Sequence, residues 1–83
     1  MVILIKLTYL NLSENKLIEL PKEFGNLTQL QILYLSDNKL VKLPKEIVNL
    51  IKLTYLDLTS NKPKELPTEI ENLIHTQSLT IIR

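Results

Sequence analysis

The strongest constraint on the fold of this chain is a sequence repeat with a period of 23 residues. Similar blocks begin at Leu7, Leu30 and Leu53, and both 30 − 7 and 53 − 30 equal 23. The blocks read LTYLNLSENKLIELPKEFGNLTQ, LQILYLSDNKLVKLPKEIVNLIK and LTYLDLTSNKPKELPTEIENLIH. Such a period is typical of architectures in which each unit buries its apolar face against its neighbours.

Partial copies flank the three blocks. Residues 1–6 align with the tail of a block, at residues 47–52, and residues 76–83 align with the head of a fourth block, in which Thr76 replaces the first leucine. We therefore expect a single domain over residues 1–83. It divides into a partial tail (1–6), three repeats (7–29, 30–52 and 53–75) and a partial fourth repeat (76–83).

Each block predicts a short strand followed by a turn and a helical segment. Leu10 and Leu12 alternate with other residues, as in a half-buried strand. Pro21 then restricts φ and favours a short helix or 3-10 segment after it. Between them stands an asparagine, whose amide can both donate to and accept from backbone groups in a turn. This asparagine recurs once in each block, as Asn15, Asn38 and Asn61.

Stacking these units predicts an α/β fold: a right-handed solenoid with a parallel sheet on one side and short helical or 3-10 segments on the other. The pattern L-x-x-L-x-L-x-x-N-x-L, matched at residues 7–17 and 30–40, resembles the leucine-rich repeat family. The continuation L-P-[KT]-E-[FI]-x-N-L resembles the repeats of short bacterial members and of the Ras-group proteins of plants and animals. This resemblance covers essentially the whole chain. It implies a concave sheet that takes part in protein–protein interaction.

The third block departs from the pattern at its eleventh position. Pro63 stands where the first two blocks have Leu17 and Leu40. Proline removes an aliphatic side chain and a backbone donor just after the Asn61 turn. The sequence therefore predicts a local loosening of the third repeat.

Tyrosines gather on the sheet face that points away from the core. One outward column should contain Tyr9, Ile32, Tyr55 and Ser78, and the next should contain Asn11, Tyr34, Asp57 and Thr80. Tyrosine combines a large contact area with a polar tip, as at many binding interfaces. The alternative is that these rings only stiffen an exposed sheet. The residues expected to bind a protein partner are Tyr9, Asn11, Ile32, Tyr34, Asp37, Tyr55 and Asp57.

No other residue pattern indicates chemistry. Glu14 and Asp37 share a column near the ends of the strands, continued by Ser60 and Arg83, and are interpreted as a solvated rim that shapes the charge presented to a partner. His75, the single histidine, is expected in an exposed loop. No phosphate-binding loop, metal-ligand cluster or nucleophile motif is present. We therefore expect no cofactor, no metal and no enzymatic activity.

The net charge and the amino-acid composition exclude several kinds of partner and site. Ten Lys+Arg stand against nine Asp+Glu, for a net charge of +1, so neither nucleic acid nor a membrane is an expected partner. Cysteine is absent, which excludes disulfides and thiolate zinc sites. Lys6 ends the apolar start of the chain, so neither a signal peptide nor a transmembrane segment is expected, and a cytoplasmic location is favoured.

The apolar ends raise a second functional hypothesis. Residues 2–5 and 79–82 are mostly aliphatic, whereas solenoids normally have polar terminal caps. Either the chain is a piece of a longer array, or its ends associate through unpaired strand edges. The alternative function is therefore a self-associating structural element, a homo-oligomer formed through the terminal strands.

Overall fold

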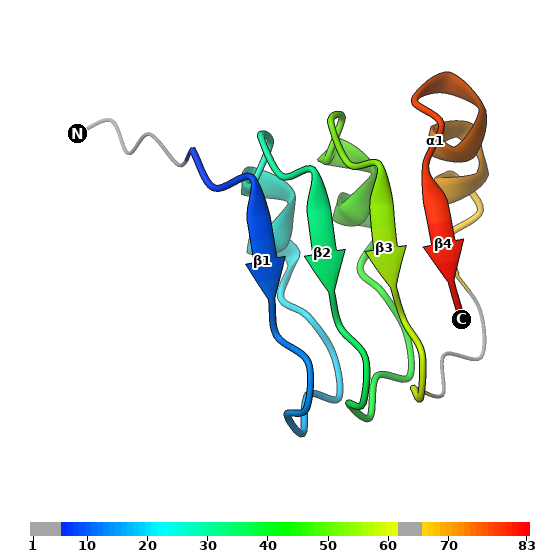
Figure 1. Ribbon diagram of the computed structural model, residues 1–83. Coiled ribbons are helices and arrows are strands. Elements are labelled where there is room, and N and C mark those ends of the chain that lie inside the picture. Colours follow the sequence, from blue (N-terminus) through cyan, green and yellow to red (C-terminus); the bar gives the residue numbers. More distant parts are fainter. Residues whose placement is uncertain (1–5, 62–65) are drawn as a thin grey trace.

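The computed structural model describes residues 6–61 and 66–83. Its strands are β1 (Tyr9–Asn11), β2 (Ile32–Tyr34), β3 (Tyr55–Asp57) and β4 (Thr80–Ile82). They form one parallel sheet in the order β1-β2-β3-β4. Behind the sheet lie two 3-10 helices, η1 (Lys22–Asn26) and η2 (Lys45–Asn49), and the helix α1 (Ile70–Thr76). In Figure 1 the chain descends each strand, returns behind it and advances to the right, which is a right-handed turn. The expected α/β solenoid is confirmed.

The core lies between the sheet and the helical segments, and it is aliphatic. The inward positions of β2 and β3, Leu33 and Leu56, are fully buried. The equivalent position of the first repeat, Leu10, is only partly buried. Each unit covers the one before it, so burial is deepest where a repeat has a neighbour on both sides.

The recurring asparagines form hydrogen bonds with backbone groups, as the sequence predicted. The Nδ2 group of Asn38 donates to the backbone oxygens of Leu12, Leu35 and Ser36, and its Oδ1 accepts from the N–H of Leu17 at 3.1 Å. Asn61 repeats the arrangement one turn later: it accepts from Leu40 and donates to Leu35 and Leu58. Asn38 and Asn61 therefore each join their own turn to that of the preceding repeat.

The single glycine of the chain stands where two helical segments approach closely. A Cβ atom on Gly25, in η1, would lie 2.9 Å from both the Cβ and the backbone oxygen of Glu46 in η2. A side chain at this position would have to displace backbone, so the close approach of η1 and η2 requires glycine there.

The register of the fourth repeat differs from the expectation by two residues. Tyr55 pairs with Thr80 and Asp57 with Ile82, whereas the sequence alignment placed Ser78 and Thr80 at those positions. The cause is α1, which runs on to Thr76, so that residues 74–76, which the alignment assigned to the turn and the next strand, are helical instead. The strand therefore starts later along the chain.

Further corrections follow from α1 and from this shift. His75 is exposed as expected, but it lies in α1 and not in a loop. Arg83 falls level with Leu58, so it does not continue the column of Glu14 and Asp37. The predictions for Pro63 and for the aliphatic residues 2–5 fall outside the described residues.

Candidate functional site

The outer face of the sheet, the face opposite the helical segments, carries a cluster of three tyrosines. Ile32 in β2 is in register with Tyr9 in β1 and with Tyr55 in β3. Tyr34 lies two residues after Ile32 and contacts both other tyrosines. Its ring centroid is 5.6 Å from each of theirs, with interplanar angles of 60° and 61°. These edge-to-face pairs stabilise the arrangement by about 0.5–1.5 kcal/mol each.

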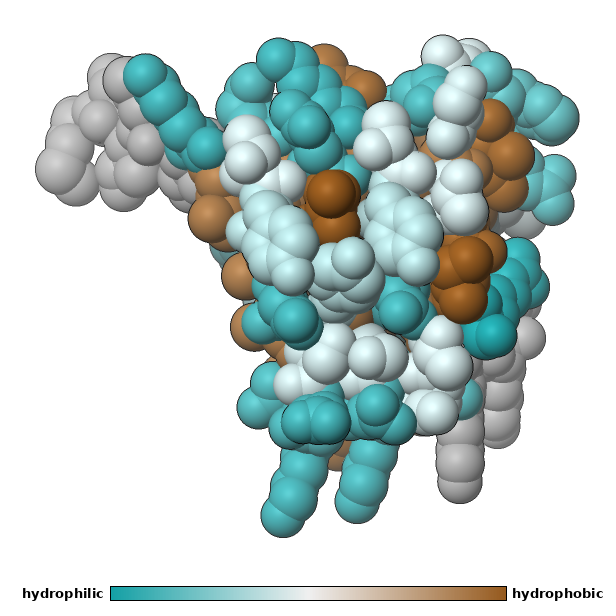
Figure 2. All heavy atoms as spheres, in the orientation of Figure 1, coloured by the Kyte–Doolittle hydropathy of each residue, from teal (hydrophilic) through white to brown (hydrophobic). Residues whose placement is uncertain are grey.

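The tyrosine cluster is accessible to a partner. Tyr9 is 52% exposed, and Ile32, Tyr34 and Tyr55 are partly exposed. Figure 2 shows this face with a hydrophobic spot over β2 between paler side chains, a second hydrophobic spot over β4, and hydrophilic groups along the upper and lower margins. An apolar centre with a polar rim is the usual composition of a binding interface.

Asn11 and Asp57 each stabilise a turn at the end of a strand on this face. The Oδ1 of Asn11 accepts a hydrogen bond from the N–H of Ser13 at 2.9 Å, and the Oδ1 of Asp57 accepts one from the N–H of Thr59 at the same distance. These contacts turn the chain at the ends of β1 and β3. The equivalent residue of β2 is Tyr34, which has no acceptor for such a turn in its ring.

The structure brings six of the seven predicted residues together on the outer face and separates one. The six that occupy strand positions are Tyr9, Asn11, Ile32, Tyr34, Tyr55 and Asp57. Asp37 lies in the turn after β2 with φ 56° and an exposed side chain. Glu14 and Ser60 adopt the same left-handed conformation, with φ 59° and 58°. This column is thus a repeated tight turn at the margin of the sheet.

One residue of the outer face was missed from the sequence. Ile82 is 38% exposed and lies in β4 beside Asp57, because of the shifted register. The signal in the sequence was the loss of the block's first leucine at Thr76, because Leu79 occupies the position at which the unshifted alignment already expects a leucine. Leu79 is buried and precedes β4 directly.

Comparison with known proteins identifies the repeat. A family model described as a leucine-rich repeat region matches residues 1–83, the full length of the chain. The chain belongs to the leucine-rich repeat family. Members of this family generally mediate protein–protein interaction and are typically non-enzymatic binding modules. A search of curated proteins found no match.

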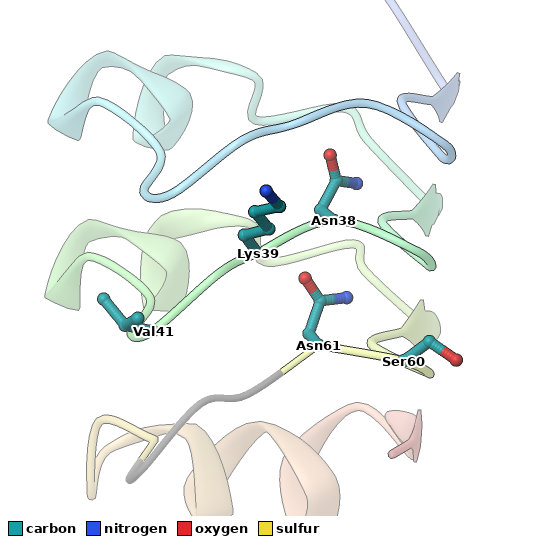
Figure 3. Close-up of a pocket in the computed structure, with 5 residues that line it drawn as sticks. All are labelled: Asn38, Lys39, Val41, Ser60 and Asn61. Atoms are coloured by element: carbon teal, nitrogen blue, oxygen red, sulfur yellow. The ribbon is translucent and has the colours of Figure 1, made fainter.

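This leucine-rich repeat protein also has a hollow between the turns of its second and third repeats. Figure 3 shows it lined by Asn38, Lys39, Val41, Ser60 and Asn61. Both asparagine side chains point the same way along the stack, toward the preceding repeat, whereas Ser60 points away. The asparagine amides are engaged with backbone groups. The hollow is therefore a consequence of the stacked turns.

The described residues contain neither a metal-binding cluster nor a membrane-spanning helix. Within residues 6–61 and 66–83, no group of three or more His, Cys, Asp or Glu side chains is arranged to hold a metal ion. Over the same residues, no helix is long and apolar enough to span a membrane.

Proposed function

We propose that this leucine-rich repeat protein binds a partner protein on the outer face of its sheet. The observation that carries the proposal is the exposed tyrosine cluster, in which Tyr34 packs edge-to-face against both Tyr9 and Tyr55. Ile32, in register with Tyr9 and Tyr55, supplies an aliphatic surface between them. These four residues would form the centre of the interface.

The packing of the cluster favours binding because its rings are already positioned. Ordering a side chain at an interface costs about 0.5–1.5 kcal/mol, and the contacts between the tyrosines already restrict their rings before a partner binds. Each hydroxyl can hydrogen-bond to a partner while the ring is covered. The competing interpretation, that the rings only stiffen the sheet, gives them a role in stability and none in binding.

A binding experiment with two matched double variants separates these interpretations. The Tyr34→Ala/Tyr55→Ala variant removes two rings of the cluster. The control, Ile18→Ala/Val41→Ala, truncates two exposed aliphatic residues that are also 23 positions apart. Val41 lies on the helical side, away from the strands (Figure 3). Each protein is immobilised, bound proteins are captured from an extract of the source organism, and folding is checked by urea titration.

The expected result is a captured protein that is lost with the tyrosine variant and retained with the control variant. Equal capture by the folded tyrosine variant would overturn the proposal and leave the rings with a stabilising role only.

A second candidate function, self-association, is supported by the open side of the first repeat. Leu7 is 39% exposed, whereas the equivalent residues Leu30 and Leu53 are fully buried by the repeats before them. A second copy of the chain, or a further repeat of a longer chain, would cover this surface. Light scattering after gel filtration tests the first case: an oligomer that Leu7→Lys dissociates would support it, and a monomer at tens of micromolar would exclude it.

A further inference from the structure

Among the described strand positions of the outer face, a single one holds a charged residue. The eight outward strand positions are Tyr9, Asn11, Ile32, Tyr34, Tyr55, Asp57, Thr80 and Ile82. Of these eight, only Asp57 is acidic, and none is basic. Asp57 therefore determines the charge that these strand positions present to a partner.

Apolar and aromatic residues surround Asp57. Tyr34 is in register with it on β2, and Ile82 is in register with it on β4. Tyr55 precedes it by two residues on β3 and so shares its face. Neighbouring parallel strands lie about 4.8 Å apart, so Tyr34 and Ile82 border Asp57 from either side, and Tyr55 lies about 6.6 Å away along β3. Asp57 is itself partly buried.

The carboxyl group is also held in position. Its Oδ1 accepts hydrogen bonds from both the N–H and the hydroxyl of Thr59. Rotation of the side chain away from the face would break both contacts. The negative charge therefore stays beside Tyr34 and Tyr55.

A partner that covers this face removes water from Asp57, and a carboxylate without water needs a cation. A guanidinium group suits the site better than an ammonium group. It is planar, weakly hydrated and stacks on aromatic rings, and its N–H groups can donate to Oδ2, since Oδ1 already accepts two hydrogen bonds from Thr59. Tyr34 and Tyr55 offer rings for such stacking.

We infer that the outer face recognises a polypeptide segment that carries an arginine. The guanidinium pairs with Asp57 against the rings of Tyr34 and Tyr55, and an apolar residue beside the arginine covers Ile32 or Ile82. The inference rests on the proposed function, because it names the partner chemistry of the same face.

The experiment selects peptides from a random displayed library on four immobilised proteins: the wild type, Asp57→Asn, Asp37→Asn and Tyr34→Ala. Asp57→Asn removes the charge and keeps the turn, because Asn11 makes the same backbone contact in the first repeat at the same 2.9 Å. Asp37→Asn is the matched control. It removes one carboxylate from the margin of the sheet, at a left-handed position that asparagine tolerates.

The expected result is enrichment of arginine in peptides selected on the wild type and on Asp37→Asn, and loss of that enrichment on Asp57→Asn. A resynthesised arginine peptide should bind Asp57→Asn about tenfold more weakly than the wild type, which corresponds to about 1.4 kcal/mol. Replacing its arginine with citrulline, which has the same shape without the charge, should weaken binding to the wild type by a similar factor. The same citrulline replacement should hardly change binding to Asp57→Asn, as expected if the arginine and the carboxylate of Asp57 interact directly.

Three outcomes would overturn the inference. These are wild-type peptides without arginine enrichment, equal enrichment of lysine, and arginine peptides whose affinity falls on Asp37→Asn but not on Asp57→Asn. If the selected peptides still lose binding on Tyr34→Ala in these cases, the proposed function stands and only the arginine assignment fails. Peptides that bind wild type and Tyr34→Ala equally would contradict the proposed function itself.

Discussion

Replacing Asn38 with alanine should destabilise this protein far more than the same change at Asn15. Asn38 is 8% exposed and makes four hydrogen bonds to backbone groups, two of them to residues of the preceding repeat. Asn15 is exposed and makes two hydrogen bonds, both within its own turn. The two residues thus have the same sequence context and different structural roles.

The magnitude follows from the backbone groups that each substitution leaves without a partner. A net contribution of about 1 kcal/mol per hydrogen bond predicts a loss of about 3–4 kcal/mol for Asn38→Ala. Water replaces the lost contacts at Asn15, so Asn15→Ala should cost about 1 kcal/mol or less. At about 0.05–0.15 kcal/mol per residue, a chain of 83 residues has a stability of about 4–12 kcal/mol. Asn38→Ala therefore removes a large share of it.

Urea titration followed by circular dichroism measures both variants, with the m-value as a check on two-state behaviour. The Asn61→Ala variant provides a second comparison, because Asn61 also accepts from and donates to the preceding repeat. The free energy of unfolding of Asn61→Ala should be close to that of Asn38→Ala. A free energy of unfolding for Asn38→Ala equal to that of Asn15→Ala would refute the view that these amides join neighbouring repeats.

Three further substitutions test the packing. Gly25→Ala should lower the free energy of unfolding by about 1–3 kcal/mol, because its Cβ would meet the backbone of η2, and an unchanged melting temperature would contradict this. In guanidinium titrations, Leu33→Ala should lower the free energy of unfolding by about 2–5 kcal/mol, at least twice the loss caused by Leu10→Ala. The reason is that Leu33 is fully buried and Leu10 is not, so equal losses would contradict this prediction. Gln77→Ala should cost about 1–3 kcal/mol, because its amide donates to the backbone oxygens of Leu50 and Leu53, and hydrogen exchange in β4 should accelerate. Unaltered exchange there would show that Gln77 does not hold β4.

The positions of most functional candidates followed from the repeat period. Once the units stack in register, residues 23 apart become neighbours, so arithmetic on the sequence predicts which side chains meet. This reasoning placed Tyr9, Ile32 and Tyr55 in one row and predicted the role of the asparagines. Both relations are local to a pair of adjacent repeats, which is why a single sequence suffices to find them.

The sequence did not predict how close the tyrosine rings lie or how their planes are tilted. It also did not separate Asp57, which sits among Tyr34, Tyr55 and Ile82, from Asp37, which lies in a left-handed turn at the margin. Both aspartates appear in variable columns of the repeat. Their different surroundings arise from backbone conformation and from neighbours on other strands.

The sequence by itself determined the solenoid, its period and the face on which the tyrosines lie, because identical spacing forces identical units to stack in register. Only the tertiary structure decided where the fourth strand pairs. The helix α1 packs against η2 of the second repeat, and Gln77, which follows it, donates to the backbone oxygens of Leu50 and Leu53. Those contacts shift β4 by two residues and bring Ile82 beside Asp57.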